Sequence, residues 1–502
     1  MSEMPHADLL HQSIDPELDR SLDALKTILN YPKNEDAQFR EYRIGSLRVC
    51  AAYIEGMADE ERIAEFVLHA IKGARDVPPD PAKRAEWLNE RLIEIAQSKS
   101  ITENSEAIPA ILSGMTCLLI DGAEEALLLE TRNYPHRSVE QPTTEAVVGG
   151  PHEGFNEHFR TNISLIRRYV QSPELITQKM TVGTRIPTQI AILYLNGVAE
   201  EKCVQEVKRR LMCIQAAKIG GIGQLQQYLE DRPYALLPQM LETERPDRAA
   251  SCLEDGQIAI ICENSPYALI APVTIFHLIH ASDDSFMRWQ YGTTLRVIRM
   301  AGILVSLLLP ALYIAVTHYH THLIPISLLT SIAESRTNVP FPILVEVLFM
   351  EFSFYLLNEA GMRTPKQIGS AFGIISALVL GQAAVSASII SPILIIIIAL
   401  TGLGSYAIPN FGFGVGLMLY RLLLVLLSAL LGIYGVILGM FLILAHLCSM
   451  KSFGVDYLAP VAPHRSHNPD ILLRLPVWRQ RRILFFAAPD SWMREKKEVK
   501  NR

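Results

Sequence analysis

The residues with the clearest potential for chemistry are three glutamates in an otherwise apolar stretch. Residues 344–361 read LVEVLFMEFSFYLLNEAG and contain Glu346, Glu351 and Glu359. Acidic side chains inside a membrane segment commonly serve ion pathways or proton relays. At about 100° per residue, however, Glu351 lies about 140° and Glu359 about 220° around a helix from Glu346. Because the three do not share one face, we expect Glu346 and Glu351 to have different partners rather than to form one relay.

Helix-breaking residues flank this glutamate stretch. Val339-Pro340-Phe341-Pro342 precedes it, and Gly361 and Pro365 follow its end. Proline removes a backbone donor and ends helices. A carboxylate at mid-bilayer costs about 2.5 to 3.5 kcal/mol even on insertion scales, which favours shielding by protein or water. We therefore predict a broken or re-entrant segment here.

A second candidate site is a run with one face of small residues, between Ser370 and Ser391. Glycine, alanine and serine recur there at intervals of three or four residues, and Gln382 and Ser386 add a polar ridge at i and i+4. Such a face either packs tightly within one subunit or lies near an oligomer axis and lines a pore. The pore-lining candidates are Ala377, Gly381, Gln382, Ala384 and Ser388.

Two other polar features have competing interpretations. His318, His320 and His322 alternate after an apolar run, which suggests a metal site but is more typical of a polar interfacial loop. Arg421 lies inside an apolar run, where it either pairs with one of the glutamates or marks a helix end. The seven cysteines form no CxxC pair and no metal-ligand cluster. We expect no metal site.

Motifs for catalysis are missing from the sequence. It contains no Gly-rich phosphate loop, no nucleophile elbow and no zinc spacing, and no base, nucleophile and orienting residue stand at recognisable spacing. We therefore expect neither an enzyme nor a cofactor.

The first half of the chain contains an internal repeat. LRVCAAYIEGMADEERIAEFVLHAIKG from Leu47 matches TQIAILYLNGVAEEKCVQEVKRRLMCI from Thr188, and SGMTCLLIDGAEEALLL from Ser113 matches DGQIAIICENSPYALIA from Asp255. Generic α/β patterning is the alternative, but two matches at nearly the same offset favour duplication. Each copy predicts a buried strand, a helix with acids in its first turn, and a closing pair of strands.

The second half is apolar. Only eight charged residues lie between Met300 and Met450, and long apolar runs cover residues 300–316, 368–400 and 412–447. A spanning helix needs roughly 20 apolar residues, so we predict about four or five spans besides the broken segment. The tail from Lys451 holds eleven Lys or Arg and five Asp or Glu, which places it in the cytoplasm with the signal-less N-terminus.

The predicted fold class is thus a multi-domain membrane protein: a cytoplasmic α/β region of two duplicated modules followed by an α-helical multi-pass transmembrane domain. The expected domains are α/β module 1 at 1–142, α/β module 2 at 143–292, the transmembrane domain at 293–450 and a basic cytoplasmic tail at 451–502.

Several longer motifs together identify a resemblance that extends from about Val139 to Pro463. They read TEAVVGGPHEGFNEHFRTNISLIRR from Thr144, TERPD from Thr243, LLLPALYIAV from Leu307, NVPFPILVEVLFMEF from Asn338, NEAGMRTPKQIGSAFGIISALVLGQAAVSASIIS from Asn358, and KSFGVDYLAPVAP from Lys451. With these motifs the chain resembles the A subunits of GerA-type spore germination receptors, the GerA/SpoVAF family of endospore-forming bacteria.

The resemblance implies a multi-pass protein of the spore inner membrane with no nucleic-acid partner. Its implied partners are a permease-like B subunit, a lipoprotein C subunit, membrane lipid and further copies of itself in a nutrient-gated cation channel. The pore helix would then fall on Ile368 to Ser391. Alternatives are a non-conducting scaffold that couples a permease-like subunit to other germination or dipicolinate-release machinery, and a secondary transporter, although the membrane half shows no internal repeat.

Overall fold

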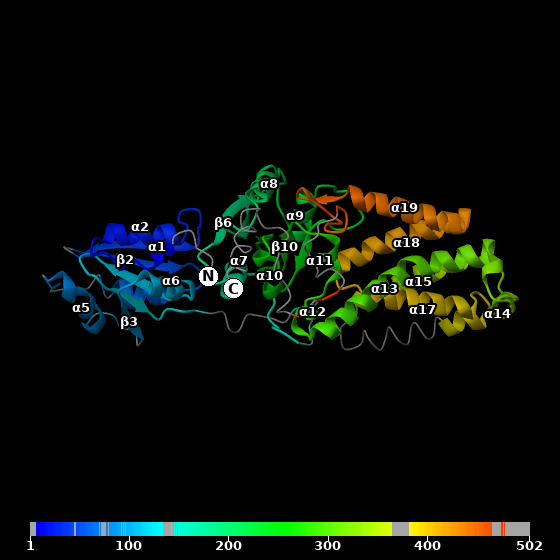
Figure 1. Cartoon of the computed structure of the whole chain (residues 1–502), viewed down its shortest axis with the longest axis horizontal. Helices are drawn as coiled ribbons and strands as arrows, with labels where there is room; N and C mark the ends of the chain where they lie inside the picture. Colours follow the sequence, from blue (N-terminus) through cyan, green and yellow to red (C-terminus); the bar gives the residue numbers. More distant parts are fainter. Residues whose placement is uncertain are drawn as a thin grey trace.

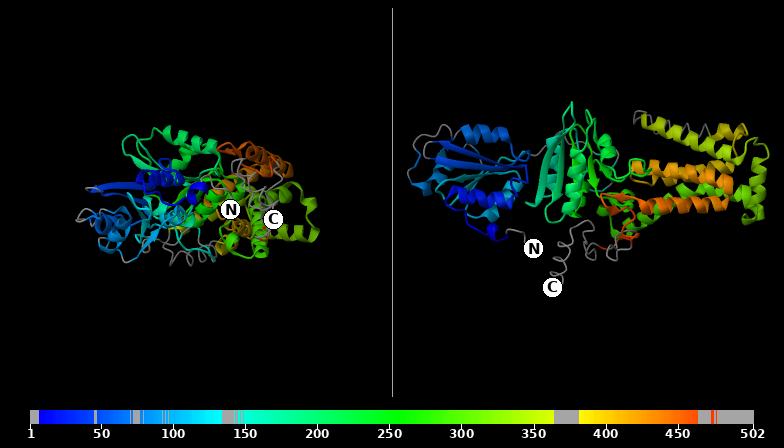
Figure 2. Two further views of the ribbon diagram at one scale, coloured as in Figure 1. Left: turned by 60° about the vertical axis from the view of Figure 1, so that its left-hand side comes forward. Right: turned by 90° about the horizontal axis from the view of Figure 1, so that it is seen from above.

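The computed structural model describes residues 7–44, 47–69, 71, 77, 78, 80–91, 93, 95, 97–133, 142, 145, 147, 149–363, 381–463, 473, 474 and 476. Two sheet modules and a helical region follow one another along the long axis of the molecule (Figures 1 and 2).

Module 1 is built on a five-stranded antiparallel sheet with the strand order β1-β2-β4-β5-β3. Its strands are β1 (Ala37–Ile44), β2 (Leu47–Ile54), β3 (Ser98–Ile101), β4 (Thr116–Ile120) and β5 (Ala126–Leu129). Its helical elements are α1 (Ala7–Leu10), α2 (Leu18–Ile28), α3 (Glu60–Arg62), η1 (Ile63–His69), η2 (Pro81–Lys83), α5 (Arg84–Arg91) and α6 (Asn104–Leu112).

Module 2 has a second five-stranded antiparallel sheet, with the order β6-β7-β9-β10-β8. Its strands are β6 (Leu175–Val182), β7 (Thr188–Leu195), β8 (Leu241–Thr243), β9 (Ile258–Cys262) and β10 (Ala268–Ala271). Its helices are α7 (Phe159–Tyr169), α8 (Glu201–Met212), α9 (Ile222–Leu229), α10 (Pro246–Glu254), α11 (Ile275–Ile279) and α12 (Asp283–Phe286).

The two sheets have the same strand order, in agreement with the internal repeat of the sequence. The acids after the first Gly turn begin a helix in each copy: Asp59 caps α3 by accepting from the amides of Glu61 and Arg62, and Glu200 precedes α8. The closing strand pairs are β4–β5 and β9–β10, as predicted. Each sheet has one more strand at its start, β1 or β6, than the sequence predicts. These edge strands are half-polar and lack the continuous apolar run by which the other strands are recognised.

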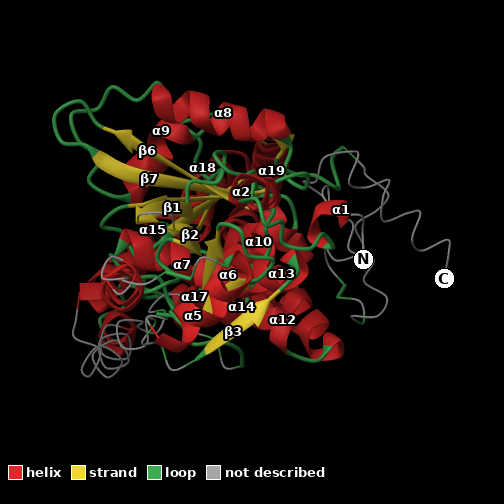
Figure 3. Ribbon diagram, turned by 90° about the vertical axis from the view of Figure 1, so that its left-hand side faces the viewer, coloured by secondary structure: helices red, strands yellow, loops and turns green. Residues whose placement is uncertain are grey.

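Helices cover both faces of each sheet. In module 2, α8 and α9 pack on one face and α7 and α10 on the other; Figure 3, viewed along the long axis, shows α8 over β6 and β7. In module 1, α2 and α6 cover one face and η1 and α5 the other. Central strands buried on both sides explain why β2, β4, β7 and β9 are apolar at nearly every position.

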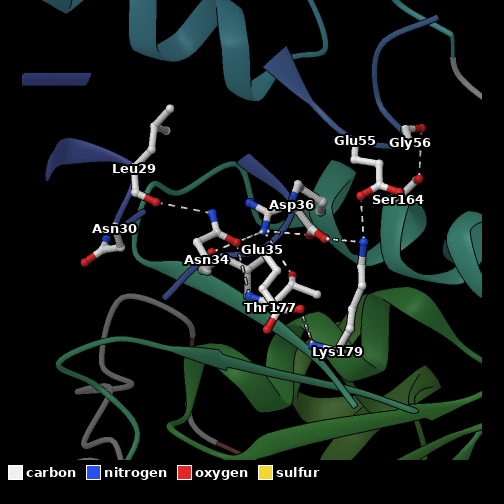
Figure 4. A network of polar contacts seen from close by, with 12 residues as sticks. Leu29, Asn30, Asn34, Glu35, Asp36, Glu55, Gly56, Ser164, Thr177 and Lys179 are labelled. Carbon is white, nitrogen blue, oxygen red and sulfur yellow. Dashed lines mark hydrogen bonds and ion pairs between the residues drawn. The ribbon is translucent and has the colours of Figure 1, made fainter. Parts of the chain in front are cut away.

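A buried ion-pair network joins the two modules (Figure 4). Arg167 of α7 and Asp36, which directly precedes β1, are almost fully buried, and the Arg167 guanidinium lies 3.1 Å from the Asp36 carboxylate. Lys179 of β6 lies 2.7 Å from Glu55 and 3.7 Å from Asp36. Arg167 also donates to the Asn34 side chain at 3.3 Å. The edge strand of module 2 is therefore covered by charged residues of module 1.

The helical region follows α12. Its elements are α13 (Trp289–Ile314), η3 (Ala315–Tyr319), η4 (Thr321–Leu323), α14 (Ile326–Arg336), α15 (Ile343–Arg363), α17 (Pro392–Tyr406), α18 (Phe411–Leu431) and α19 (Ile433–Ser449). Among the described residues, two helices are long and apolar enough to cross a membrane: Trp289–Tyr319 and Phe411–Leu431. The apolar helices α17 and α19 are shorter. The number of spans stays a prediction.

The glutamate stretch is not broken, contrary to expectation. It forms one continuous helix, α15, which starts directly after Pro342 and continues to Arg363. A break is unnecessary because two of the three carboxylates, those of Glu346 and Glu351, are buried against cations from other helices. Pro340 and Pro342 precede the helix, where the first amides need no intrahelical partner.

The chain returns to module 2 after α19. A hairpin of β11 (Lys451–Ser452) and β12 (Val455–Asp456) packs against this module. The Ser452 hydroxyl donates to the carbonyl of Gln239 at 2.7 Å, and the Tyr457 hydroxyl donates to that of Pro238 at 2.8 Å. Burial raises the pKa of Tyr457 well above its usual value. The start of the predicted basic tail is thus part of the sheet region.

Candidate functional site

A buried arginine joins four helices of the helical region. Arg421 of α18 is 2% exposed, and its guanidinium lies 3.0 Å from the carboxylate of Glu351 on α15. The same group donates to the carbonyl and hydroxyl oxygens of Ser306 on α13, at 3.1 and 2.9 Å, and to the Ser405 hydroxyl on α17 at 3.2 Å. It also contacts the Tyr355 hydroxyl of α15. Of the two roles considered for Arg421, the structure shows the ion pair.

This Arg421 network stabilises one arrangement of the four helices. The hydroxyls of Ser306 and Ser405 lie 2.7 Å apart, so α13 and α17 are linked even without the guanidinium. Removing one partner of a buried ion pair typically destabilises a protein by about 3 to 5 kcal/mol, because the other charge stays buried and uncompensated. The network can therefore hold the four helices together.

Glu346 has different partners. Its carboxylate lies 2.8 Å from the Arg336 guanidinium of α14 and accepts from the backbone amide of Ser391 at 3.1 Å. Ser391 is the N-cap residue of α17, where the helix macrodipole favours a negative charge. Glu359, in contrast, is exposed. The three glutamates point in different directions from α15, and each has different surroundings: Arg421 for Glu351, Arg336 and Ser391 for Glu346, and an exposed position for Glu359.

The described pore-lining candidates differ in exposure within the protomer. Residues 381–386 are helical. Gln382 is exposed, whereas Ala384, two residues on, is 6% exposed and belongs to the apolar core. Gly381 and Ser388 are half-buried, and Ser388 has a positive φ of 55° just before α17. Ala377 lies outside the described residues. Of this set, Gln382 has the most accessible side chain.

Charged groups also anchor the start of α13. Asp284 of α12 is 1% exposed, and its carboxylate lies 3.3 Å from Arg296 and 3.0 Å from Arg299, both on α13. Burial by itself raises the pKa of Asp284, but the hydrogen bond and charge of Arg299 and the charge of Arg296 outweigh it, so this pKa lies below its usual value. Arg474 donates to the Ser285 carbonyl at 2.8 Å. Buried ion pairs therefore join module 2 to α13.

The histidine run and the cysteines do not gather into a site. In the part of the chain that the structure describes, no three His, Cys, Asp or Glu side chains are arranged to hold a metal ion. His320 lies 3.3 Å from the carbonyl of Ala315, and the adjacent Tyr319 donates to that of Ala429 at 2.6 Å. All seven cysteines are free. The histidines thus lie in and between η3 and η4, close to the C-terminal end of α18.

Sequence reasoning missed the hydroxyl partners of Arg421. Ser306, Tyr355 and Ser405 each interrupt an apolar helical run, and that interruption was the available signal. It also missed Asp284, whose arginine partners come 12 and 15 residues later. A local pattern shows that a polar residue is unusual but does not show which other helix it faces.

A family profile and individual relatives both match nearly the whole chain. The profile of the Bacillus/Clostridium GerA spore germination protein family matches residues 23–483. Spore germination protein KA of Bacillus subtilis (strain 168) is 36% identical over 488 residues, which cover 96% of this chain and 88% of that protein. The uncharacterized membrane protein YfkQ of the same organism is 35% identical over 472 residues, 93% of this chain and 91% of that protein.

A solved structure also matches part of the chain. The crystal structure of the N-terminal domain of the A subunit of the Bacillus megaterium spore germinant receptor GerK3 is 25% identical, covers 52% of this chain and 97% of that chain, and has a TM-score of 0.41. The match of the family profile over nearly the whole sequence shows that this chain belongs to the GerA family of spore germination proteins.

Proposed function

We propose that this chain is an A subunit of a nutrient-responsive germination receptor and forms an oligomeric, gated cation channel in the spore inner membrane. Its partners in this proposal are a permease-like B subunit, a lipoprotein C subunit and further copies of itself. Family membership and two helices long enough to cross a membrane support the assignment.

The observation that carries the channel proposal is the exposed polar ridge beside α17. The side chains of Gln382 and Ser386 are both exposed and stand one helical turn apart, next to helices whose outer faces are apolar. Polar groups facing lipid are unfavourable, so within a bilayer this ridge requires a second subunit or water. A ring of such ridges around an oligomer axis would line an aqueous path.

The Arg421 network supports a particular way of gating. It ties α13, α15, α17 and α18 together within one protomer. In our proposal the channel therefore opens when these helices move as a unit relative to neighbouring protomers. The hairpin after α19 packs on module 2, which supports the placement of both on the cytoplasmic side.

Ion flux from liposomes that contain the purified chain tests the proposal. Gln382→Glu and Gln382→Lys change the charge at one exposed position in opposite directions with similar side-chain size. A cation pathway lined by this residue predicts faster potassium flux for Gln382→Glu and slower flux for Gln382→Lys than for the parent. Ala384→Leu serves as a packing control, because this side chain is buried in the protomer.

Two results together would rule out the channel. The parent protein would not conduct in liposomes, and cells that lack the protein would still release cations on exposure to nutrient. Equal effects of both Gln382 variants would indicate a structural defect instead of a pore. The non-conducting scaffold then becomes the better proposal, and it predicts that partner capture and germination depend on the sheet modules but not on the charge at position 382.

A further inference from the structure

A short turn of module 2 presents apolar side chains at the molecular surface. Residues 232–238 lie in the segment that connects α9, which ends at Leu229, to β8, which begins at Leu241. Tyr234 is 98% exposed and Leu236 is 41% exposed. The turn is nevertheless held firmly: the Gln239 side chain donates to the carbonyl of Arg232 at 2.8 Å and accepts from its amide at 3.0 Å. The aromatic ring of Tyr234 therefore projects outward from a fixed backbone.

The turn lies against the beginning of α18. A Cβ atom added at Gly416 would be 2.4 Å from the carbonyl oxygen of Leu236, and one at Gly412 would be 3.6 Å from Pro238. Glycine at these two positions lets the turn approach the first turns of the helix. This contact places Tyr234 near the end of α18 that faces module 2, and Figure 1 shows α9 at that end.

Other aromatic side chains are exposed at the same end of the helical region. Tyr406 ends α17 and Phe411 begins α18, and both are largely exposed. Exposed aromatic residues at the ends of apolar helices are typical of the membrane interface, where a ring with a polar tip can contact both headgroups and acyl chains. Tyr234 extends this set from the helices to module 2.

Basic residues accompany the exposed tyrosine. A surface cavity of about 460 Å³ lies beside the turn, lined by Arg232, Ser449 and Lys451 together with Glu206, Arg210, Asp231, Phe453 and Gly454. The acidic groups of the cavity, Glu206 and Asp231, are paired with Arg210. Arg232 instead donates to the neutral hydroxyl of Ser449 at 2.8 Å. Its charge can therefore attract anionic headgroups.

We propose that the turn 232–238 inserts into the interfacial layer of the bilayer, with Tyr234 among the lipid headgroups and Arg232 beside their phosphates. The partner is thus the lipid surface itself. This proposal rests on the proposed function, in which α18 spans the membrane. Its test must therefore distinguish failure of the turn to insert from failure of α18 to insert.

Tryptophan quenching by lipids can make this separation. The full chain is reconstituted into liposomes of phosphatidylcholine and phosphatidylglycerol, with or without bromine on the acyl chains near the headgroup. Three variants each add one tryptophan to the four native ones. Tyr234→Trp probes the turn, Leu426→Trp probes an exposed position on α18, and Tyr31→Trp probes a half-exposed aromatic position in module 1. Module 1 lies at the opposite end of the molecule (Figure 2).

We expect brominated lipid to quench the added emission of Tyr234→Trp and Leu426→Trp but not that of Tyr31→Trp. Adding Arg232→Gln to Tyr234→Trp should weaken the quenching.

If Leu426→Trp is quenched and Tyr234→Trp is not, the turn lies outside the interface, and this inference is wrong while the proposed function still stands. Protection of the new tryptophan from aqueous acrylamide without lipid quenching would overturn it in favour of a protein contact. If Leu426→Trp is not quenched, the membrane placement of α18 itself fails.

Discussion

At the residue scale, the acidic side chains of α15 differ in what surrounds them. Glu351 is buried with Arg421, and Glu359 is exposed. Glu346 is buried between Arg336 of α14 and the N-cap residue Ser391 of α17. Their shared residue type therefore hides different physical roles. Of these three glutamates, only Glu351 pairs with a cation, Arg421, whose contacts join four helices.

Glu351→Gln should destabilise the protein more than the same change at an exposed position of the same helix. Arg421 would remain buried without a counter-charge, which typically removes about 3 to 5 kcal/mol from the free energy of unfolding. Thermal unfolding of the detergent-solubilised full chain measures this loss, with Glu359→Gln as the matched control. Combining Glu351→Gln with Arg421→Gln should be less harmful than the sum of the single changes. Equal melting temperatures for Glu351→Gln and Glu359→Gln would show that the pair does not contribute.

Glu346→Gln should have a milder and distinct effect. The amide oxygen of glutamine can still accept from the Ser391 backbone, so only the ion pair with Arg336 is lost. We expect a smaller loss of stability than for Glu351→Gln, and additive losses in the double variant, because the two carboxylates have separate partners. The measurement is the same unfolding assay combined with ion flux. Indistinguishable single variants, with a double variant no worse, would indicate one shared carboxylate site.

The half-buried His277 of α11 should make module 2 sensitive to mild acid. Burial and the nearby charge of Arg248 lower the pKa of His277 to about 4, from a usual value of about 6.5. Since the unfolded chain binds the proton more readily, this contribution to stability is present above pH 6.5 and lost as the pH falls toward 4, by about 3 kcal/mol in total. His277→Gln should therefore reduce the difference in unfolding free energy between pH 7 and pH 5, whereas His11→Gln, at an exposed position, should not. An unchanged difference in His277→Gln would contradict this origin of the acid sensitivity.

At the scale of secondary-structure elements, close helix packing depends on small residues that the sequence places within apolar runs. Gly404 of α17 faces Gly302 of α13, so that their backbones touch. Small residues at such crossings let apolar helices approach and gain van der Waals contact. The same crossing brings Ser306 and Ser405 within reach of Arg421.

Gly404→Ala should disrupt this crossing. The added Cβ would lie 2.4 Å from the carbonyl oxygen of Gly302, a backbone atom that cannot move without shifting α13. We expect a loss of about 1 to 3 kcal/mol, typical of overpacking, and altered ion flux because the Arg421 network is attached to the same two helices. Gly414→Ala on α18 is the control, because nothing lies within 4 Å of a Cβ there. Equal melting temperatures for the two variants would contradict the close approach.

At the scale of the whole molecule, three bodies follow one another, and each junction between them is made by buried polar groups. Arg167 and Asp36 join module 1 to module 2, and Asp284 joins module 2 to α13. Such directional contacts fix the orientation of neighbouring bodies more specifically than apolar contacts alone, since an unpaired buried charge is strongly unfavourable. The two junctions therefore define how the three bodies are oriented relative to one another.

Asp36→Asn should loosen the junction between the modules without unfolding either sheet. Arg167 would lose its counter-charge, and the edge of β6 would open more often. Hydrogen exchange at the amides of Thr177 and Lys179 should then be faster than in the parent. Glu35→Gln is the control, because this neighbouring side chain is exposed and glutamine still accepts from the Lys179 amide. Slow exchange in both variants would show that the ion pair does not hold the modules together.

The sequence predicted the elements better than their contacts. The repeat, the acids at the helix starts and the closing strand pairs follow from local apolar periodicity and turn residues, so they were recognised. The edge strands β1 and β6 were missed because half-polar strands lack a continuous apolar run. The break predicted in the glutamate stretch was wrong, since two of its carboxylates are buried against distant cations that the helix itself does not show.

What the sequence by itself determined is therefore local: the duplicated sheets, the apolar helices, the family and the unusual polar residues within the helices. The tertiary structure alone decided that Arg421 meets Glu351, Ser306 and Ser405, that Glu346 meets the start of α17, and that Gln382 is exposed whereas Ala384 is buried. The reason is physical. Helix and strand signals arise from neighbours a few residues apart, whereas the partner of a buried charge can be 45 residues away, as for Glu346 and Ser391, and is selected only when the helices pack.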